Sequence, residues 1–346
     1  MSTKSRGNII RRQILRDVAH HPTDIASHIG QIFSISRQAV NKHLKKLVDD
    51  DWLEASGTTR NRSYKLGARR KKVMQVALNK DISEHSIYFK EFSWIIEGLP
   101  KNIDDIVVYG FTEMLNNAID HSEGKECFIS FSRDKSEICI IISDDGEGIF
   151  KRITRLKDLS DEKQALLELH KGKLTTDPEN HSGQGVFFTS RMFDNFAIFS
   201  HDLVFNHNHE IEIDYFSDEH GHQSQEGTTI VMSISVTSDR IDIGVFEQFT
   251  AGEDDDFSFN KTIIPVSMAR FDKENLVSRS QAKRLLVRLE NFEYVVFDFK
   301  NVNSIGQAFA DEIFRVYRLR SPSINISHDN ANTDVLKMIK RAESDL

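Results

Sequence analysis

The stretch from Glu113 to His121 constrains this chain most, because it places three polar side chains on one face of an expected helix. Glu113, Asn117 and His121 stand at positions i, i+4 and i+8, which lie in a row along a helix surface. The positions that face the other way are apolar: Met114, Leu115, Ala118 and Ile119. An amphipathic helix of this kind packs its apolar side against a sheet. We therefore expect the polar row to border a pocket.

Three glycine motifs follow this helix at domain-scale spacing. Two strand-like runs, 127–132 and 137–143, are joined by a polar turn, and the second run leads directly into Asp144-x-Gly146-x-Gly148. Gly183-x-Gly185 and Gly227-Thr228 come later. One such motif alone is typical of an ordinary turn, whereas the helix motif and three glycine motifs in a fixed order form a specific pattern.

In this order the motifs resemble the GHKL superfamily of ATP-binding domains, which includes gyrase and the histidine kinases. Within it, the chain is most similar to bacterial anti-sigma-factor protein kinases, whose helix motif reads Glu, three residues, Asn-Ala and then a His. The resemblance covers about residues 85–236. It implies an α/β sandwich with a mixed sheet and helices on one face, and it implies ATP and Mg²⁺ as cofactors.

The residue types suit that chemistry. Asn117 offers a neutral oxygen to a Mg²⁺ ion that keeps its waters and bridges phosphate oxygens. Glu113, one turn earlier, is placed to take a proton as a general base. Asp144 is a short carboxylate that can accept from the exocyclic amine of adenine, with Thr228 joined to the ring through a water. Gly146 and Gly148 let the backbone approach the base and sugar closely.

The second glycine motif precedes an expected helix over 186–193, so that free N–H groups near Gly183 and Gly185 would face phosphates. His121 has two interpretations. It either takes part in the chemistry or meets the negative end of its own helix.

The N-terminal part of the chain carries the opposite charge from the rest. Residues 1–72 hold sixteen Lys and Arg against six Asp and Glu, a net charge of +10, while residues 73–346 hold 29 against 47, or −18. This uneven distribution predicts an anionic partner for the N-terminal part only.

Three expected helices and a hairpin make up this basic part and resemble a winged helix-turn-helix of bacterial transcription regulators. The third helix begins at Ser36, and the hairpin tip spans 56–62. In that family the third helix enters the major groove and the wing touches the DNA backbone. The expected DNA-binding residues are Ser36, Arg37, Gln38, Asn41, Lys42, Lys45, Arg60 and Arg62. The alternative is a winged helix that serves only dimerisation or protein contact.

The remaining segments complete a multidomain α+β interpretation. We expect a winged-helix domain at 1–68, a helical linker at 69–100, a GHKL-type domain at 101–240 with a mobile lid at 151–182, and a C-terminal domain at 255–346. In the last domain, strands alternate with helices, and the runs 295–302 and 309–312 resemble a STAS-like domain. The phosphorylated Ser of related STAS proteins is not matched, since Gln307 and Ala308 stand nearest and Ser304 comes earlier.

Two further patterns were weighed as sites. Five histidines lie between His201 and His222, and their two His-x-His pairs fit either a metal ion or, as we expect, a strand pair. His85 is the only nearby phosphoacceptor for a true histidine kinase, and its surroundings do not match that motif.

Composition excludes other classes. The 346 residues suggest two or three domains, no apolar run is long enough to cross a membrane, and residues 1–30 show no secretory signal. Cys127 and Cys139 fall in expected strands, which favours reduced core residues of a cytoplasmic protein.

The leading hypothesis is a transcription regulator, expected to be a homodimer, in which ATP controls DNA binding and the STAS-like domain meets a protein partner. The rival is a Ser/Thr protein kinase of a partner switch, with Glu113 as base and a partner or Ser304 as acceptor. A third interpretation, ATPase work in a defence or repair complex, has no motif of its own.

Overall fold

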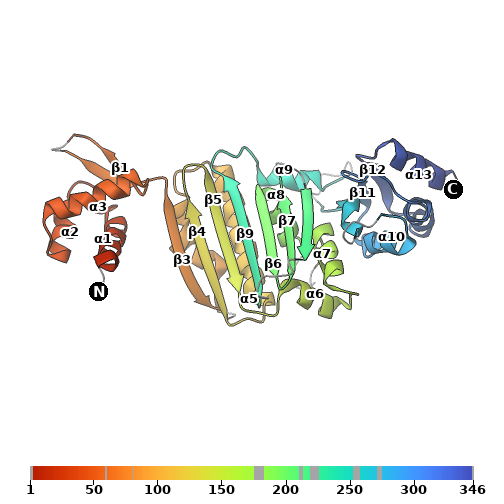
Figure 1. Ribbon diagram of the computed structural model, residues 1–346, viewed down its shortest axis with the longest axis horizontal. Helices are drawn as coiled ribbons and strands as arrows, with labels where there is room; N and C mark the ends of the chain where they lie inside the picture. Colours follow the sequence, from red (N-terminus) through yellow and green to blue (C-terminus); the bar gives the residue numbers. More distant parts are fainter. Residues whose placement is uncertain are drawn as a thin grey trace.

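The computed structural model describes residues 3–58, 61–79, 81–174, 183–209, 213–218, 226–251, 258–270 and 275–344, without the side chains of 3–5 and 213–218. Its elements form three units along the chain: an N-terminal head, a central unit and a C-terminal unit (Figure 1). Arg60, expected in the wing, lies outside the described residues, as does the acidic stretch at 252–256 that precedes the expected C-terminal domain.

The head consists of three helices and a two-stranded hairpin. These are α1 (Thr3–Asp17), α2 (Ile25–Phe33), α3 (Arg37–Asp49), β1 (Leu53–Ser56) and β2 (Ser63–Leu66). Ser36 starts α3 because its hydroxyl accepts a hydrogen bond from the Ala39 N–H at 3.2 Å, which satisfies one free donor at the helix start. Buried residues of all three helices, including Ile14, Ile29 and Leu44, form a core of the head alone. These elements are compatible with a winged helix.

A seven-stranded sheet is the framework of the central unit. Its strands, in spatial order, are β3 (Arg70–Ala77), β4 (Glu126–Arg133), β5 (Glu137–Asp144), β9 (Thr228–Ser235), β6 (Asn195–Ser200), β7 (Leu203–Asn208) and β8 (Ile213–Asp218). Every pair of neighbours in it is antiparallel. The expectation of a mixed sheet was therefore wrong. Hairpins join three of the six neighbouring pairs, β4–β5, β6–β7 and β7–β8, and a hairpin makes its strands antiparallel.

Helices cover one face of this sheet, and the long helix α5 crosses behind the strands in Figure 1. The helical segments are α4 (Glu84–Ile87), η1 (Tyr88–Phe92), η2 (Ser93–Ile95), α5 (Lys101–His121), α6 (Ile149–Lys157), α7 (Glu162–Lys171), α8 (Gly185–Met192) and α9 (Asp242–Gln248). Aromatic rings fix the layers, because Phe111 of α5 lies 6.1 Å from Phe131 of β4 and 5.3 Å from Phe92 of η1, centroid to centroid.

The C-terminal unit is a small α/β unit with a parallel three-stranded sheet. Its elements are β10 (Lys261–Pro265), η3 (Val266–Ala269), α10 (Arg279–Leu286), η4 (Leu289–Asn291), β11 (Tyr294–Asp298), α11 (Gln307–Asp311), η5 (Glu312–Tyr317), α12 (Arg318–Arg320), β12 (Asn325–Asp329) and α13 (Thr333–Glu343). The strand order is β10-β11-β12, with both pairs parallel. The alternating strands and helices expected here are confirmed.

The central and C-terminal units share one hydrophobic core, whereas the head has its own. Buried side chains form a continuous cluster that runs from Val76 in β3 to Ala342 in α13. The head meets the central unit through a short connection, in which Arg69 lies 5.3 Å above the Trp52 ring, and through an ion pair between Lys135 and Asp51 at 2.7 Å. The head is thus joined to one edge of the sheet, and the C-terminal unit to the opposite side (Figure 1).

The expectation of a helical linker at 69–100 was wrong for the first part of this segment. Arg70–Ala77 forms β3, which pairs with β4 along its full length. Arg70 is also tied to the helical turn beyond it, because its guanidinium donates to the Trp94 carbonyl. The pattern misled because polar and apolar residue types do not alternate along this edge strand, which is rich in Lys and Arg, although its burial does alternate.

Two other expectations concern short segments. β7 and β8 pair as the expected strands of the histidine-rich region, and the described residues contain no group of three metal-ligating side chains. His220 and His222 lie outside the described residues. No helix within the described part of the chain has the length and apolar character needed to span a bilayer.

Candidate functional site

A cavity of about 330 Å³ opens between α5, the end of β5, α6 and the start of α8. We call it the α5 cavity. Seven of the eight residues expected around a nucleotide line it: Glu113, Asn117, Asp144, Gly148, Gly183, Gly185 and Thr228. Gly146 lies next to it in the same loop. Motifs spread over more than 110 residues therefore meet around one space of the size that small ligands occupy.

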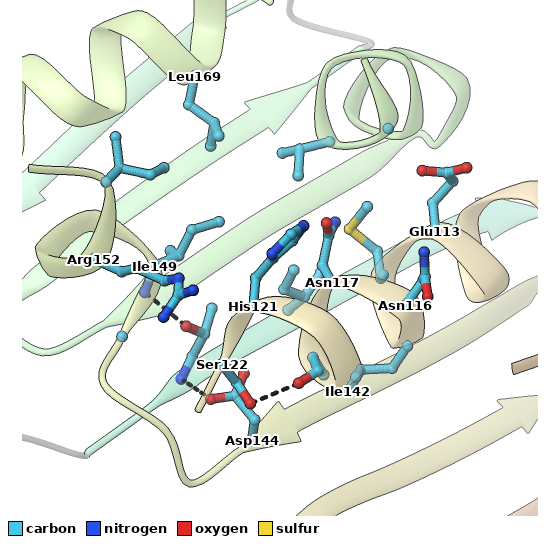
Figure 2. A pocket seen from close by; sticks show the side chains of 18 of the residues that line it. Glu113, Asn116, Asn117, His121, Ser122, Ile142, Asp144, Ile149, Arg152 and Leu169 are labelled. Carbon is cyan, nitrogen blue, oxygen red and sulfur yellow. Dashed lines mark hydrogen bonds between the residues drawn. The ribbon is translucent and has the colours of Figure 1, made fainter. Parts of the chain in front are cut away.

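The polar row on α5 faces this cavity. Glu113, Asn117 and His121 all line it, and Figure 2 shows Asn117 and His121 side by side with Glu113 one turn away. Met114 and Ala118 are buried and form part of its apolar floor together with Ile142 and Ile230 of the sheet. The helix thus supplies both polar groups and apolar surface to the cavity.

Asp144 ends β5 at one end of the cavity. Its Oδ1 accepts hydrogen bonds from the N–H groups of Gly146 at 3.0 Å and Thr228 at 3.2 Å. Burial raises the pKa of this carboxyl, and the two N–H donors oppose that rise. Thr228 Oγ1 in turn accepts from the Ile149 N–H at 2.9 Å, so that the loop after β5 and the start of β9 are held together. The result is a fixed acceptor at the end of an apolar pocket.

The glycines are required by close backbone approaches. A Cβ at Gly146 would overlap the Ser122 carbonyl oxygen, and a Cβ at Gly227 would overlap that of Asp144. Gly227 also has φ +88° and Gly148 has φ +90°, values that side chains disfavour. Gly146 therefore acts from behind the cavity wall, by letting the loop pass Ser122 and turn its N–H toward Asp144.

The second glycine motif brings the start of α8 to the opposite end of the cavity. Gly183 adopts φ +70°, and a Cβ there would overlap the Leu174 carbonyl group; Gly185 is the first residue of α8. The side chain of Gln184, the N-cap residue, makes no hydrogen bond to the N–H groups at the start of α8. The Glu113 carboxylate lies directly against Gly185. A carboxylate and a helix start thus converge at this end, where an anion is favoured.

The hydrogen bonding of the Asn117 side chain indicates whether the cavity suits a polar ligand. Its Nδ2 is buried and has no hydrogen-bond partner, an arrangement that costs free energy unless a ligand or water supplies one. The oxygen and nitrogen of an amide are interchangeable by a half turn of the side chain, so Asn117 can present either a donor or an acceptor. The donor set near it fits a phosphate-bound cation better than an all-protein metal cage.

Some cavity residues were not foreseen from the sequence. Asn116 of α5, Arg152 and Ile153 of α6, and Leu169 of α7 all line it. The Arg152 guanidinium donates to Glu123 and brings a cation to the rim. Its spacing of four residues from Gly148 was the available signal, because one turn of helix after the glycine loop must face the same space.

The expected DNA-binding residues of α3 share one exposed face. Ser36, Arg37, Gln38, Asn41, Lys42 and Lys45 are exposed, while Val40, Leu44 and Leu47 are buried in the head. Arg62 is exposed at the hairpin and lies 5.6 Å from the Tyr64 ring. A helix face of donors and cations therefore stands next to a basic hairpin.

Comparison with known families agrees with the central and C-terminal geometry. Residues 104–238 match the model of the histidine kinase-, DNA gyrase B-, and HSP90-like ATPases. Residues 281–336 match that of a STAS-like domain of unknown function. A search of curated proteins found no match. The chain therefore contains a GHKL-type ATPase domain and a STAS-like domain, while the head must be argued from its own residues.

Proposed function

We propose that this chain, with its GHKL-type ATPase domain and STAS-like domain, is a DNA-binding transcription regulator controlled by ATP. One observation carries the proposal. The head leads directly into β3, which pairs with β4, which pairs with β5, and β5 ends at Asp144 in the α5 cavity. The head that carries the exposed basic face of α3 is thus covalently joined to a strand of the same sheet that borders the cavity.

The two ends of the cavity suit the two ends of ATP: the Asp144 end suits the base, and the α8 end suits the phosphates. Adenine would lie on Ile142 and Ile230, which are paired neighbours in the sheet, with its amine on Asp144, and Thr228 would reach the ring through a water. The phosphates would lie toward the start of α8 and its Gly183-x-Gly185 motif, whose N–H groups favour an anion. Asn117 would hold the accompanying Mg²⁺, which would offset the phosphate charge. The support is the apolar floor, the fixed Asp144 acceptor and the partnerless Asn117 amide.

DNA is the partner of the head in this proposal. Five of the exposed residues of α3 combine Arg, Gln and Asn, which pair with base edges, with Lys, which neutralises phosphates: Arg37, Gln38, Asn41, Lys42 and Lys45, with Ser36 as the N-cap. Residues 1–68 form the DNA-binding domain, and residues 101–240 and 255–346 hold the ATPase and STAS-like domains. β3 belongs with the ATPase sheet, and the whole is a homodimer in the cytoplasm.

The test measures DNA affinity of the full chain by fluorescence polarisation, with and without a non-hydrolysable ATP analogue and Mg²⁺. The affinity of the wild type changes with nucleotide, and Asn117→Ala abolishes that change while the affinity without nucleotide stays as in the wild type. A matched control is Asn325→Ala, an exposed Asn in β12 far from the cavity. Nucleotide binding with no change in DNA affinity would remove the control step from the proposal.

A second candidate is an ATP-dependent Ser/Thr protein kinase, and the position of Glu113 favours it. Its carboxylate lies at the phosphate end of the cavity, against Gly185, where a general base for an incoming hydroxyl is needed. The acceptor is a partner protein or Ser304, which is exposed before α11. Incubation with γ-labelled ATP separates the candidates: label on protein that Glu113→Gln abolishes supports the kinase, and free phosphate alone supports an ATPase switch.

A further inference from the structure

Helix α7 lies in the chain between the Gly146-x-Gly148 and Gly183-x-Gly185 motifs. It is buried between the central unit, to which it belongs, and the C-terminal unit. All eight residues from Gln164 to Lys171 are buried, and they include two charged side chains, Glu168 at 2% exposure and Lys171 at 1%. The helix contacts α6, α8 and β10. Burying two opposite charges costs free energy unless each charge is well paired. The contacts of Glu168 and Lys171 therefore show which groups stabilise the buried helix.

The pair grips the end of α10 in the C-terminal unit. Lys171 Nζ lies 2.7 Å from Glu168 Oε1 and donates to the carbonyl oxygens of Val287 at 2.7 Å and Arg284 at 3.4 Å. Gln164 Nε2 donates to Glu168 at 2.8 Å and to the same Arg284 oxygen at 3.2 Å. The last carbonyls of a helix have no partner within it and carry its negative end. Lys171 therefore acts as a cap for α10, supplied by a different domain.

Two bonds beside this grip strengthen the same junction. Thr262 of β10 donates from Oγ1 to the Lys171 carbonyl at 2.9 Å. Lys173 donates to the Asn291 carbonyl at 2.7 Å and lies 4.9 Å from the Phe292 ring. Between them, Gly172 at φ +84° passes so near the Phe259 ring that a Cβ would lie 2.6 Å from it. Glu168 Oε2 also lies 3.8 Å from Arg288 Nε of the C-terminal unit. We call the contacts of Gln164, Glu168, Lys171 and Lys173 with the C-terminal unit the α7 clasp.

The same helix forms part of the α5 cavity. Leu169, between Glu168 and Lys171, lines the cavity, as does Leu174 just beyond the clasp (Figure 2 shows Leu169 above His121). Leu169 thus faces the cavity while its neighbours Glu168 and Lys171 face the C-terminal unit. A displacement of α7 by a ligand in the cavity would therefore also displace its contacts with α10. The head, by contrast, is joined at the opposite edge through β3 and the Lys135–Asp51 pair.

We propose that Lys171 is a positioning residue for the nucleotide and that the STAS-like domain is the first receiver of nucleotide occupancy. This inference rests on the proposed binding of ATP. The α7 clasp holds Leu169 at the cavity, so nucleotide binding tightens the junction with α10, and the C-terminal unit in turn raises nucleotide affinity. The coupling is reciprocal, as any thermodynamic linkage between two sites must be.

The test compares the wild type with Glu168→Gln/Lys171→Met, in which both charges of the pair are removed together and the side-chain volume is kept. The probe is a non-hydrolysable ATP analogue with Mg²⁺. In the wild type, it increases the protection of α10 and β10 amides from hydrogen exchange. In the double variant that increase is lost, and nucleotide affinity falls about tenfold, within the usual range of coupling between sites. Lys283→Met, at an exposed position of α10, serves as the matched control and behaves as the wild type.

Lys173→Met, which removes a half-exposed contact of the clasp, gives a smaller loss in the same direction and keeps the test valid if the double variant folds poorly. Nucleotide binding with unchanged exchange of α10, or an undiminished increase in both clasp variants, would overturn the inference. A wild type that binds no nucleotide would instead overturn the proposed function. A purely structural role lowers the stability of the variants and leaves the nucleotide-induced protection in place.

Discussion

Asp144 accepts a hydrogen bond from the backbone N–H of Thr228 at 3.2 Å, which ties together two residues 84 positions apart in the chain. The bond fixes one oxygen of the carboxylate and leaves the group as an acceptor at the end of the α5 cavity. Because burial raises its pKa, the charge of Asp144 responds to acidification at a higher pH than that of an exposed Asp.

Nucleotide affinity is expected to fall as pH decreases through the raised pKa of Asp144, since the protonated carboxyl is a poorer acceptor for adenine. Asp144→Asn binds at least about tenfold more weakly at neutral pH, as expected for a lost hydrogen bond to a charged group, and its affinity is flat over the same pH range. Calorimetric titration with the ATP analogue measures both. Asp134→Asn is the control, because Asp134 is exposed in the turn between β4 and β5 and its pKa is lowered by the N–H groups of Ser136 and Glu137.

The same group affects stability with the opposite sign. Its folded pKa lies above its unfolded value, so the folded state binds the proton more tightly, and acidification through that pKa adds to the stability of the unliganded protein. Thermal unfolding should therefore show a shrinking nucleotide-induced rise in Tm as pH falls. A rise in Tm that stayed constant across this range, or that Asp144→Asn did not alter, would contradict the role of Asp144 in binding.

Gly227 is expected to tolerate no side chain, for two separable reasons. It has φ +88°, and a Cβ there would overlap the Asp144 carbonyl. Gly98 has the similar φ of +83° with nothing within 4 Å of a Cβ, so Gly98→Ala measures the cost of the backbone conformation alone, about 1 to 2 kcal/mol. Gly227→Ala should lower the free energy of unfolding by more than this, in denaturant titrations, and should abolish nucleotide binding. Equal losses in the two variants would mean that the close approach has no energetic weight.

Local patterns were sufficient to predict the elements that build the cavity and the C-terminal unit. The row of Glu113, Asn117 and His121 could be found because a single helix sets its spacing. The glycines could be found because close backbone approaches leave few other residues possible. The strand β3 could not be predicted, since its partner β4 begins about fifty residues later. Polar and apolar residue types also do not alternate along this edge strand.

The α7 clasp shows a second limit. The segment from 151 to 182 reads as a mobile lid with scattered leucines among charges, and charged residues are normally assigned to solvent. Glu168 and Lys171 are instead buried, because the C-terminal unit supplies carbonyl oxygens from Arg284 and Val287, more than a hundred residues later. Neighbouring residues in the sequence cannot predict the burial of a charge whose hydrogen-bond partner is a distant backbone carbonyl.

Removing one charge of this pair is expected to cost more than removing both. Lys171→Met leaves the buried Glu168 with only the half-exposed Arg288, at 3.8 Å, as a cationic neighbour. It should lower the free energy of unfolding by up to about 3 to 5 kcal/mol near neutral pH, whereas Glu168→Gln/Lys171→Met should lose much less. Burial raises the pKa of Glu168, so the single variant should regain stability as pH falls and the carboxyl takes up a proton. Urea unfolding at several pH values tests both points. A double variant as unstable as the single one would show that the carbonyl contacts of Lys171, rather than the charge pair, stabilise the junction.

The face of α3 should contact both phosphates and base edges, and these two roles separate by salt dependence. Lys45→Ala removes a cation from the exposed face, so it should weaken binding to all duplexes alike and reduce the slope of log affinity against log salt by about 1. Asn41→Ala should leave that slope unchanged and reduce the preference for a selected sequence over random DNA, because an amide reads adenine in the major groove. Lys90→Ala, an exposed lysine of η1 in the central unit, is the control for loss of charge alone. If Lys45→Ala and Asn41→Ala both bound DNA as the wild type does, the head would be a dimerisation or protein-contact module, and the basic charge of residues 1–72 would need another anionic partner.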